Sequence, residues 1–218
     1  AACPAVSGDS VLELGCGVGT AALCLHARVP GLRLTGIERQ AEIAAIARDN
    51  AHAMGATMDV VSADLGALPP EIRQQSFDQV IANPPYFTRD NSLASGHKAR
   101  EAAMGEDTPL DIWLDVAARR LRPKGWLTMI QRPERLEDML SGLRGRLGSV
   151  QVLPLVPRTG RDCSLILLRA RKDGRAPLRL LSPFVLHNGP RHESDKEDYT
   201  PLARDVLRAG KAISLFEN

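Results

Sequence analysis

The chain has 218 residues, of which 44% are hydrophobic and 25% charged, and its formal net charge at pH 7 is +2. This composition excludes a disordered, fibrous or disulfide-dense protein, and the length is enough to bury a core in one domain. No apolar run approaches the length of a membrane span, and no charged-then-apolar leader opens the chain. The sequence therefore predicts a cytoplasmic protein with no membrane association.

Charge is distributed unevenly along the chain. Residues 1–118 hold 8 Lys and Arg against 15 Asp and Glu, whereas residues 119–196 hold 17 against 7. A basic later part indicates a polyanionic partner, although an arginine-rich solvated surface gives the same pattern. The four cysteines show no paired metal spacing, so reduced, buried thiols and no metal site are expected: Cys3, Cys16, Cys24 and Cys163.

Strand and helix patterns alternate along most of the chain. The expected strands cover residues 9–14, 32–37, 58–62, 77–82, 126–131, 151–156 and 164–169. The expected helices cover 20–27, 41–54, 108–121 with Thr108 as its cap, 133–147 and 199–208, with a helical turn at Pro69 and Pro70. The alternation predicts an α/β fold, a doubly wound and mostly parallel sheet of seven strands with helices on both faces. The last two strands have no helix between them, which predicts an antiparallel hairpin at one edge.

Two segments fall outside this alternation. Residues 87–107 lack a clear periodicity, which in a compact domain indicates a functional loop or disorder. Residues 173–218 are expected to form a C-terminal appendage packed on a domain of residues 1–172. The chain opens at Ala1 without methionine and almost directly enters the first strand, so residues upstream of it are expected.

A glycine loop and three acids follow the first three strands. Gly15, Gly17 and Gly19 permit a tight turn and close backbone approach to a ligand, at a helix start with free N–H groups. Glu38 can accept hydrogen bonds from both hydroxyls of a ribose, and Asp64 from an adenine amine. Glu13, just before the loop, can hold the loop or meet an ammonium group. Each acid alone reads equally well as a helix cap or a solvated turn, but the set predicts one acidic rim at the strand ends.

The order of these residues resembles that of class I S-adenosylmethionine-dependent methyltransferases. The three glycines of this chain have the spacing G-x-G-x-G, which differs from the G-x-G-x-x-G of dinucleotide-binding proteins. The resemblance implies a Rossmann-like methyltransferase fold and S-adenosylmethionine as cofactor, since a cationic sulfonium suits an acidic rim. The implied cofactor-binding residues are Glu13, Gly15, Gly17, Gly19, Glu38, Asp64 and Asn83.

The fourth strand leads into Asn83-Pro84-Pro85-Tyr86. The exocyclic amine of adenine is a poor nucleophile because its lone pair is delocalised into the ring, so it needs two acceptors for its N–H bonds. The Asn83 amide oxygen and the Pro84 carbonyl can supply them, and the prolines stiffen the turn. Tyr86 offers a ring on which a base can stack. Asn83, Pro84 and Tyr86 are therefore the predicted catalytic residues; the alternative is a proline-rich turn with a buried tyrosine. The motif resembles that of amino-methyltransferases acting on adenine in DNA or RNA, guanine in ribosomal RNA or the glutamine amide of release factors, and alone it does not choose among them.

Across most of its length the chain resembles the bacterial tRNA adenine-N6 methyltransferases of the "methyltransferase small" family, which act on a valine tRNA. The resemblance lies in residues 12–20, 81–87 and 96–102 and in Tyr199-Thr200-Pro201. It implies methyl transfer to the exocyclic amine of an adenine in RNA, with tRNA as partner. Lys98, Arg100, Arg171 and Lys172 are the expected contacts with RNA phosphates. Acidic residues lie near Lys98 and Arg100 in the sequence. They favour a solvated lid at that loop at least as much as a contact with RNA phosphates.

Two other functions fit the same motifs. Release-factor glutamine methyltransferases use the same Asn-Pro-Pro-Tyr logic on a planar amide nitrogen, and they resemble this chain in the core. A non-catalytic RNA-binding module on this fold is the alternative from a different class. The presence of Asn83, Glu38 and Asp64 argues against that second alternative.

Overall fold

The computed structural model describes residues 1–86, 108–192 and 197–216. Its helices are α1 Thr20–Arg28, α2 Ala41–Ala53, α3 Pro70–Arg73, α5 Leu110–Arg120, α6 Leu136–Leu143 and α7 Pro201–Ala209. Short 3-10 turns are η1 Leu65–Ala67, η3 Pro133–Arg135 and η4 Ser214–Phe216. The strands are β1 Ser10–Leu14, β2 Arg33–Glu38, β3 Met58–Ser62, β4 Phe77–Ala82, β5 Leu121–Gln131, β6 Gly148–Val156, β7 Leu165–Arg171, β8 Arg179–Leu180 and β9 Phe184–Val185.

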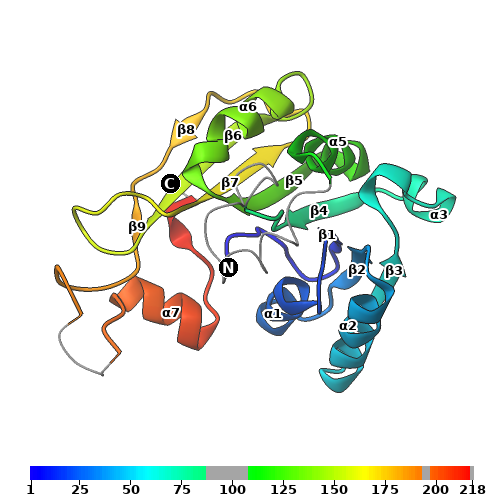
Figure 1. Ribbon diagram of the computed structural model, residues 1–218, viewed down its shortest axis with the longest axis horizontal. Helices are drawn as coiled ribbons and strands as arrows, with labels where there is room; N and C mark the ends of the chain where they lie inside the picture. Colours follow the sequence, from blue (N-terminus) through cyan, green and yellow to red (C-terminus); the bar gives the residue numbers. More distant parts are fainter. Residues whose placement is uncertain (87–107, 193–196, 217–218) are drawn as a thin grey trace, which may run out of the picture.

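Within the described residues the strands form one sheet of nine, in the order β3-β2-β1-β4-β5-β7-β6-β8, with β9 also paired to β6 (Figure 1). β3, β2, β1, β4 and β5 run parallel, while β7 lies antiparallel between β5 and β6. Parallel neighbours need a crossover connection, which the helices supply. The predicted α/β fold, doubly wound and mostly parallel with an antiparallel hairpin, is confirmed.

The strand order reverses between β1 and β4. From β1 the chain continues to β2 on one side, and from β4 to β5 on the other. Leu14 ends β1 and is paired in register with Ala82, which ends β4. Gly15 and Asn83 therefore leave the sheet from adjacent strands at the same edge. In open α/β sheets such a reversal is where ligands bind, because the two loops diverge and leave a crevice.

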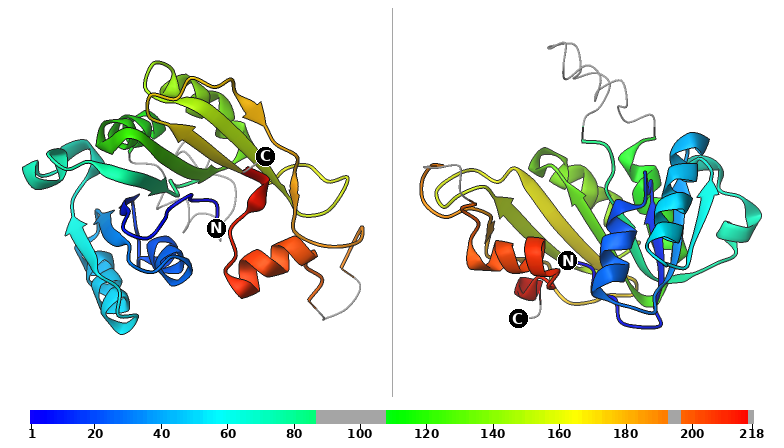
Figure 2. Two further views of the ribbon diagram at one scale, coloured as in Figure 1. Left: turned by 180° about the vertical axis from the view of Figure 1, so that it is seen from behind. Right: turned by 90° about the horizontal axis from the view of Figure 1, so that it is seen from below.

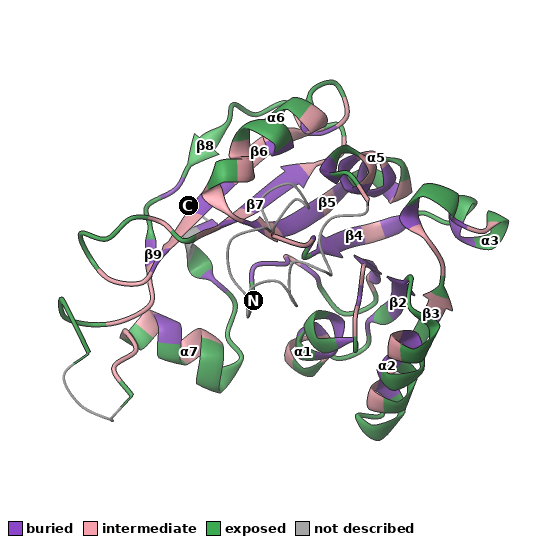
Figure 3. Cartoon of the chain, viewed as in Figure 1, coloured by how far each residue is buried: buried purple, intermediate pink, exposed green. Residues whose placement is uncertain are grey.

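Helices cover both faces of the sheet (Figure 2). Leu12 and Leu14 of β1 belong to the largest buried cluster, which α5 and α6 complete on one face. Val11, which precedes Leu12 on the same strand, packs on the other face with Ala22 of α1. This alternation follows from the two-residue period of a strand. Figure 3 shows the buried residues concentrated along the central strands, so the site at their ends stands on a packed core.

The described part of residues 173–218 extends the sheet and covers it. β8 and β9 both pair in parallel with β6. Ala203 of α7 and Phe216 pack with Leu153 of β6 on the face that α1 and α2 also cover. The predicted sheet of seven strands lacked these two short additions, because strands of two residues show no periodicity in the sequence.

Thr200 fixes the start of α7. Its hydroxyl accepts a hydrogen bond from the Ala203 backbone nitrogen at 3.2 Å and donates to the Val185 carbonyl at 2.8 Å. Just before it, Asp198 bonds the Nδ1 of His187 at 2.5 Å and a guanidinium nitrogen of Arg158 at 2.5 Å. Hydrogen bonds from Arg158 and the two histidines, His192 and His187, hold the pKa of Asp198 far below its usual value. The segment before α7 is thereby joined to the β6–β7 loop through Asp198 and Arg158.

Most element boundaries differ from the prediction by one to three residues, and larger differences occur at β5 and α6. The cap of α5 is Pro109, not Thr108, and it makes no side-chain cap hydrogen bond. The Thr108 carbonyl instead accepts a hydrogen bond from the Trp113 indole at 3.2 Å. β5 begins at Leu121, because the pairing of Leu121 with Phe77 of β4 extends it back from the predicted start. The predicted helix 133–147 is shorter, as η3 followed by α6.

Candidate functional site

The glycine loop after β1 is built from left-handed backbone. Gly15, Gly17 and Gly19 have φ values of 60°, 53° and 85°, a region that other residues adopt only at a cost. The Cys16 nitrogen donates to the Ile37 carbonyl at 2.8 Å, which carries the β1–β2 ladder into the loop. Gly19 is the N-cap of α1. The predicted loop is thus a rigid turn between strand and helix.

Gly15 and Gly17 have different surroundings. A Cβ at Gly15 would lie 2.5 Å from Cη2 of Trp113 in α5, so the loop rests directly on that indole. A Cβ at Gly17 would meet nothing within 4 Å. Gly15 therefore faces the protein, while open space adjoins Gly17.

Glu13 is buried beneath the loop with an exposed fraction of only 4%. Its Oε2 accepts a hydrogen bond from the Ala22 backbone nitrogen at 3.0 Å, in the first turn of α1. Burial raises the pKa of Glu13 to about 8, and the Ala22 N–H only partly offsets this. Of the two roles considered from the sequence, this geometry supports holding the loop to α1.

Glu38 joins the loop to the next helix. Its Oε2 accepts from the Gly17 nitrogen at 3.0 Å, and its Oε1 accepts from the Gln40 nitrogen at 2.9 Å, just before α2. A carboxylate has about four lone-pair positions, so each oxygen keeps capacity for one further donor. Asp64 follows β3, and its Oδ1 caps η1 through the Gly66 nitrogen at 2.7 Å. Both acids combine a structural hydrogen bond with remaining acceptor capacity.

The Asn83-Pro84-Pro85-Tyr86 corner follows β4 directly. Asn83 is exposed, Pro84 is buried and Tyr86 is half-buried. Burial raises the pKa of Tyr86, and the hydrogen bond that its hydroxyl shares with the Asn83 side chain partly offsets this rise. The corner therefore presents an accessible amide beside an ordered aromatic ring.

Gln131, a residue that the sequence reasoning missed, supports this corner from β5. It has an exposed fraction of 0%. Its Nε2 donates to the Pro85 carbonyl at 3.2 Å and lies 3.5 Å from the Pro84 carbonyl oxygen. Nothing in the local sequence marks this contact, because it depends on the register between β4 and β5.

Two of the four predicted nucleic-acid contacts, Arg171 and Lys172, lie away from this corner. Lys98 and Arg100 lie outside the described residues. Arg171 is paired in register with Trp126, which precedes Gln131 on β5 by five residues, or about 17 Å at the usual strand rise. The Arg171 Nε donates to the Lys124 carbonyl at 3.0 Å, and the Lys172 Nζ to the Ala118 carbonyl at 2.8 Å. Arg171 and Lys172 therefore lie at the opposite edge of the sheet from Asn83.

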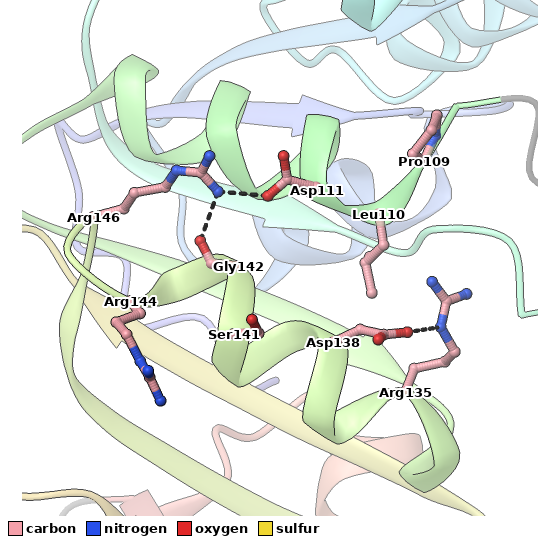
Figure 4. A pocket seen from close by; sticks show the side chains of 9 residues that line it. All are labelled: Pro109, Leu110, Asp111, Arg135, Asp138, Ser141, Gly142, Arg144 and Arg146. Carbon is pink, nitrogen blue, oxygen red and sulfur yellow. Dashed lines mark hydrogen bonds and ion pairs between the residues drawn. The ribbon is translucent and has the colours of Figure 1, made fainter.

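A pocket of about 510 Å³ lies between α5 and α6 (Figure 4). Its acids are paired with its arginines: Asp111 with Arg146 at 2.6 Å, and Asp138 with Arg135 at 2.8 Å. The described residues that line it include none of the predicted site residues. We assign it no part in the site.

All four cysteines are free thiols, but only Cys3 and Cys16 are buried as expected, since Cys24 is exposed and Cys163 is half-buried. Burial, with the nearby carboxylates Glu13 and Glu38, raises the pKa of Cys16 to about 12. Across residues 1–86, 108–192 and 197–216, no group of three or more His, Cys, Asp or Glu side chains is arranged to hold a metal ion. In the same part of the chain, no helix has both the length and the apolar character needed to cross a membrane.

The chain is similar in sequence to known methyltransferases. Residues 11–101 match a family model described as a methyltransferase domain. A tRNA1(Val) (adenine(37)-N6)-methyltransferase of Porphyromonas gingivalis is 35% identical over 136 residues, covering 59% of this chain and 51% of the relative. A release factor glutamine methyltransferase of Geobacter sulfurreducens is 29% identical over 147 residues, covering 64% of this chain and 50% of the relative. The chain thus spans about half the length of these curated relatives.

The fold also has solved counterparts. A predicted O-methyltransferase from Agrobacterium tumefaciens superposes with a TM-score of 0.74 at 24% sequence identity, covering 94% of this chain and 91% of that one. The likeness at this level of identity establishes the Rossmann-like methyltransferase fold.

Proposed function

This chain contains a methyltransferase domain with a Rossmann-like fold, and from that premise we propose that it transfers a methyl group from S-adenosylmethionine to the exocyclic amine of an adenine in RNA. The RNA is a tRNA, modified in the cytoplasm. The observation that carries the proposal is the pairing of Leu14 with Ala82. It brings the glycine loop and the Asn-Pro-Pro-Tyr corner out of adjacent strands, so a donor on one would face an acceptor on the other.

The residues after β1, β2 and β3 fit the cofactor. S-adenosylmethionine supplies an electrophilic methyl group on a cationic sulfur, together with a ribose and an adenine. Open space adjoins Gly17, and Glu38 beside it keeps acceptor capacity on both carboxylate oxygens for the two ribose hydroxyls. Asp64 keeps capacity for the adenine amine. Glu13 holds α1 in place beneath the loop.

Asn83, Pro84 and Tyr86 orient the acceptor. The Asn83 amide oxygen and the Pro84 carbonyl each accept one N–H bond of the amine, which favours a pyramidal nitrogen and directs its lone pair. The exposure of Asn83 leaves its amide accessible to a substrate, and Tyr86 offers a stacking face worth about 1–3 kcal/mol. The rate gain comes from positioning and from fixed acceptors rather than from a general base.

The choice of substrate rests on the relatives. The Porphyromonas gingivalis relative, named for adenine methylation in tRNA, shares 35% identity with this chain. The Geobacter sulfurreducens relative, named for glutamine methylation in release factors, shares 29%. The second observation keeps the release factor as the alternative substrate, because the corner suits any planar nitrogen with two N–H bonds.

A substrate assay tests the proposal. The protein is incubated with S-adenosylmethionine carrying a labelled methyl group and, separately, with bulk tRNA, a release factor and duplex DNA. We expect label in tRNA alone and N6-methyladenosine in its nucleoside digest. Label in the release factor would establish the alternative, and no label in any substrate would overturn the proposed activity.

Asn83→Ala tests the corner itself. Loss of one fixed acceptor lowers kcat by about 100-fold. The turnover is measured at saturating S-adenosylmethionine, so that any weaker cofactor binding caused by the loss of the Asn83 side chain does not enter kcat. Full methylation by the variant would favour a chemistry that does not use this corner. If neither protein methylates RNA but both bind it, the non-catalytic RNA-binding module is the better account.

A further inference from the structure

Gln131 is the one fully buried amide that faces the Asn-Pro-Pro-Tyr corner among the described residues. It is the last residue of β5 and is 0% exposed. Its Nε2 lies 3.2 Å from the Pro85 carbonyl oxygen and 3.5 Å from that of Pro84. Burying the carbonyl and the NH₂ of a side-chain amide is costly unless both are hydrogen-bonded, so the contacts of Gln131 define its role.

The orientation of the Gln131 amide is fixed by its neighbours. Its Oε1 accepts from the Arg132 backbone nitrogen at 2.8 Å, and a backbone N–H can only donate. The carbonyls of Pro84 and Pro85 can only accept. Reversing the amide would set two donors against each other on one side and acceptors together on the other. The NH₂ group is therefore aimed at the corner.

The prolines explain why a side chain is needed there. The ladder between β4 and β5 ends with Ala82 paired to Met129. Pro84 has no N–H, so the backbone pairing cannot continue through it. Gln131 lies two residues beyond Met129, level with the corner, and its side chain supplies the donor that the main chain would otherwise provide. The corner is thus tied to the sheet by one amide.

We propose that Gln131 is a positioning residue: its side-chain amide fixes the direction of the Pro84 and Pro85 carbonyls, and hence the second acceptor for the substrate amine. This inference rests on the proposed methyl transfer. A carbonyl has two lone pairs, so the one at Pro84 can accept from Gln131 and from the substrate together. Gln131 acts through Pro84 and does not touch the substrate itself.

Two substitutions of Gln131 distinguish a residue that orients the Pro84 carbonyl from one that only fills space beneath the corner. Gln131→Met keeps similar bulk and removes both hydrogen-bonding groups. We expect kcat for RNA methylation to fall by about 10- to 100-fold, because a small misplacement of an acceptor is enough for such a loss. The Kd for S-adenosylhomocysteine stays within about twofold, since the glycine loop and Glu38 are untouched.

Gln131→Glu supplies the sharper readout. A carboxylate would turn a negative oxygen toward the corner carbonyls, whereas the protonated acid can donate to them as the amide does. We expect kcat of this variant to rise as pH falls, relative to wild type and to Gln131→Met at the same pH. A residue that only fills space would give no such difference between the Glu and Met profiles.

Thr128→Val is the matched control. Thr128 lies on the same strand, is buried at 7% exposure, and its hydroxyl has no hydrogen-bond partner within the described residues. The kinetics of this variant should equal those of wild type, and its melting temperature should be equal or higher, because valine removes a buried hydroxyl that has no hydrogen-bond partner. A Gln131→Met protein that folds as well as Thr128→Val but keeps the wild-type kcat overturns the inference.

The result remains decisive if the wild type methylates nothing. In that case the proposed function fails, and crystal structures of wild type and Gln131→Met decide on Gln131 alone. A reoriented Pro84 carbonyl in the variant supports the inference, and an unchanged corner overturns it.

Discussion

Gly15 and Gly17 share a left-handed backbone but differ in what surrounds them, which separates two reasons for a glycine. Gly17 needs only the backbone freedom, because a Cβ there would meet open space. Gly15 needs that freedom and also the absence of a side chain, because Trp113 occupies the adjoining volume. The sequence could assign both glycines to a loop, but the second requirement comes from a helix far along the chain.

We therefore expect Gly17→Ala and Gly15→Ala to destabilise the fold unequally. Gly17→Ala loses about 1–2 kcal/mol of unfolding free energy through its left-handed backbone. Gly15→Ala loses roughly 1–3 kcal/mol more, through overpacking against Trp113. Urea unfolding measures both. Adding Trp113→Phe to Gly15→Ala should recover part of the extra loss, and equal losses in the two single variants would contradict the steric account.

At the scale of elements, Glu13 connects β1 to the first turn of α1 through one hydrogen bond made in a buried place. Burial favours the uncharged acid, so the folded pKa of about 8 lies above the ordinary glutamate pKa of 4.5. Between these pH values the unfolded chain has released a proton that the folded chain keeps. Stability therefore falls as pH rises through this window.

Glu13→Gln should remove this dependence. The glutamine carbonyl can still accept from Ala22, and it has no proton to lose. Relative to wild type, the variant gains up to about 1.4 kcal/mol of unfolding free energy per pH unit across the window. Urea unfolding at about pH 5 and about pH 8 measures the gain. Glu42→Gln, exposed on α2, is the control and should track wild type; parallel curves for both variants would refute the assignment.

Elements whose ends are set by local sequence signals could be predicted, whereas those set by contacts with distant residues could not. β3 and β4 have the bounds predicted, because their apolar runs end at local signals such as Asp64 and Asn83-Pro84. The start of β5 was missed because Pro123 and Gly125 favour a turn, whereas pairing of Leu121 with Phe77 makes it a strand. For the same reason Gln131 could not be found: its contact depends on pairing between strands.

At the scale of the whole molecule, the acids predicted to bind the cofactor and the basic residues Arg171 and Lys172 lie at opposite edges of the sheet. Glu38 and Asp64 lie at the carboxyl ends of parallel strands, near Asn83. Arg171 and Lys172 lie at the other end of the sheet, where β7 finishes. A tRNA that places a base at Asn83 would reach them only by extending along the sheet, and both side chains already donate to backbone carbonyls.

We expect the double substitution Arg171→Gln and Lys172→Gln to weaken tRNA binding if these groups bind phosphates. The slope of log affinity against log salt would shrink by about one for each phosphate that is no longer neutralised. Filter binding at several salt concentrations measures it. Arg204→Gln on α7, where Arg204 pairs with Glu197, is the control. An unchanged slope in the double variant would remove both residues from the interface.

The contact between Gly15 and Trp113 has an optical consequence. An indole reports the polarity of its surroundings in its emission, and this one lies against the loop over which a ligand would settle. The other tryptophan, Trp126, stacks with Arg169 and Arg171 at the far edge, so it contributes a constant background when only the cofactor is titrated. The chain therefore contains its own fluorophore for occupancy of the loop, and titrations can be followed without attaching a dye.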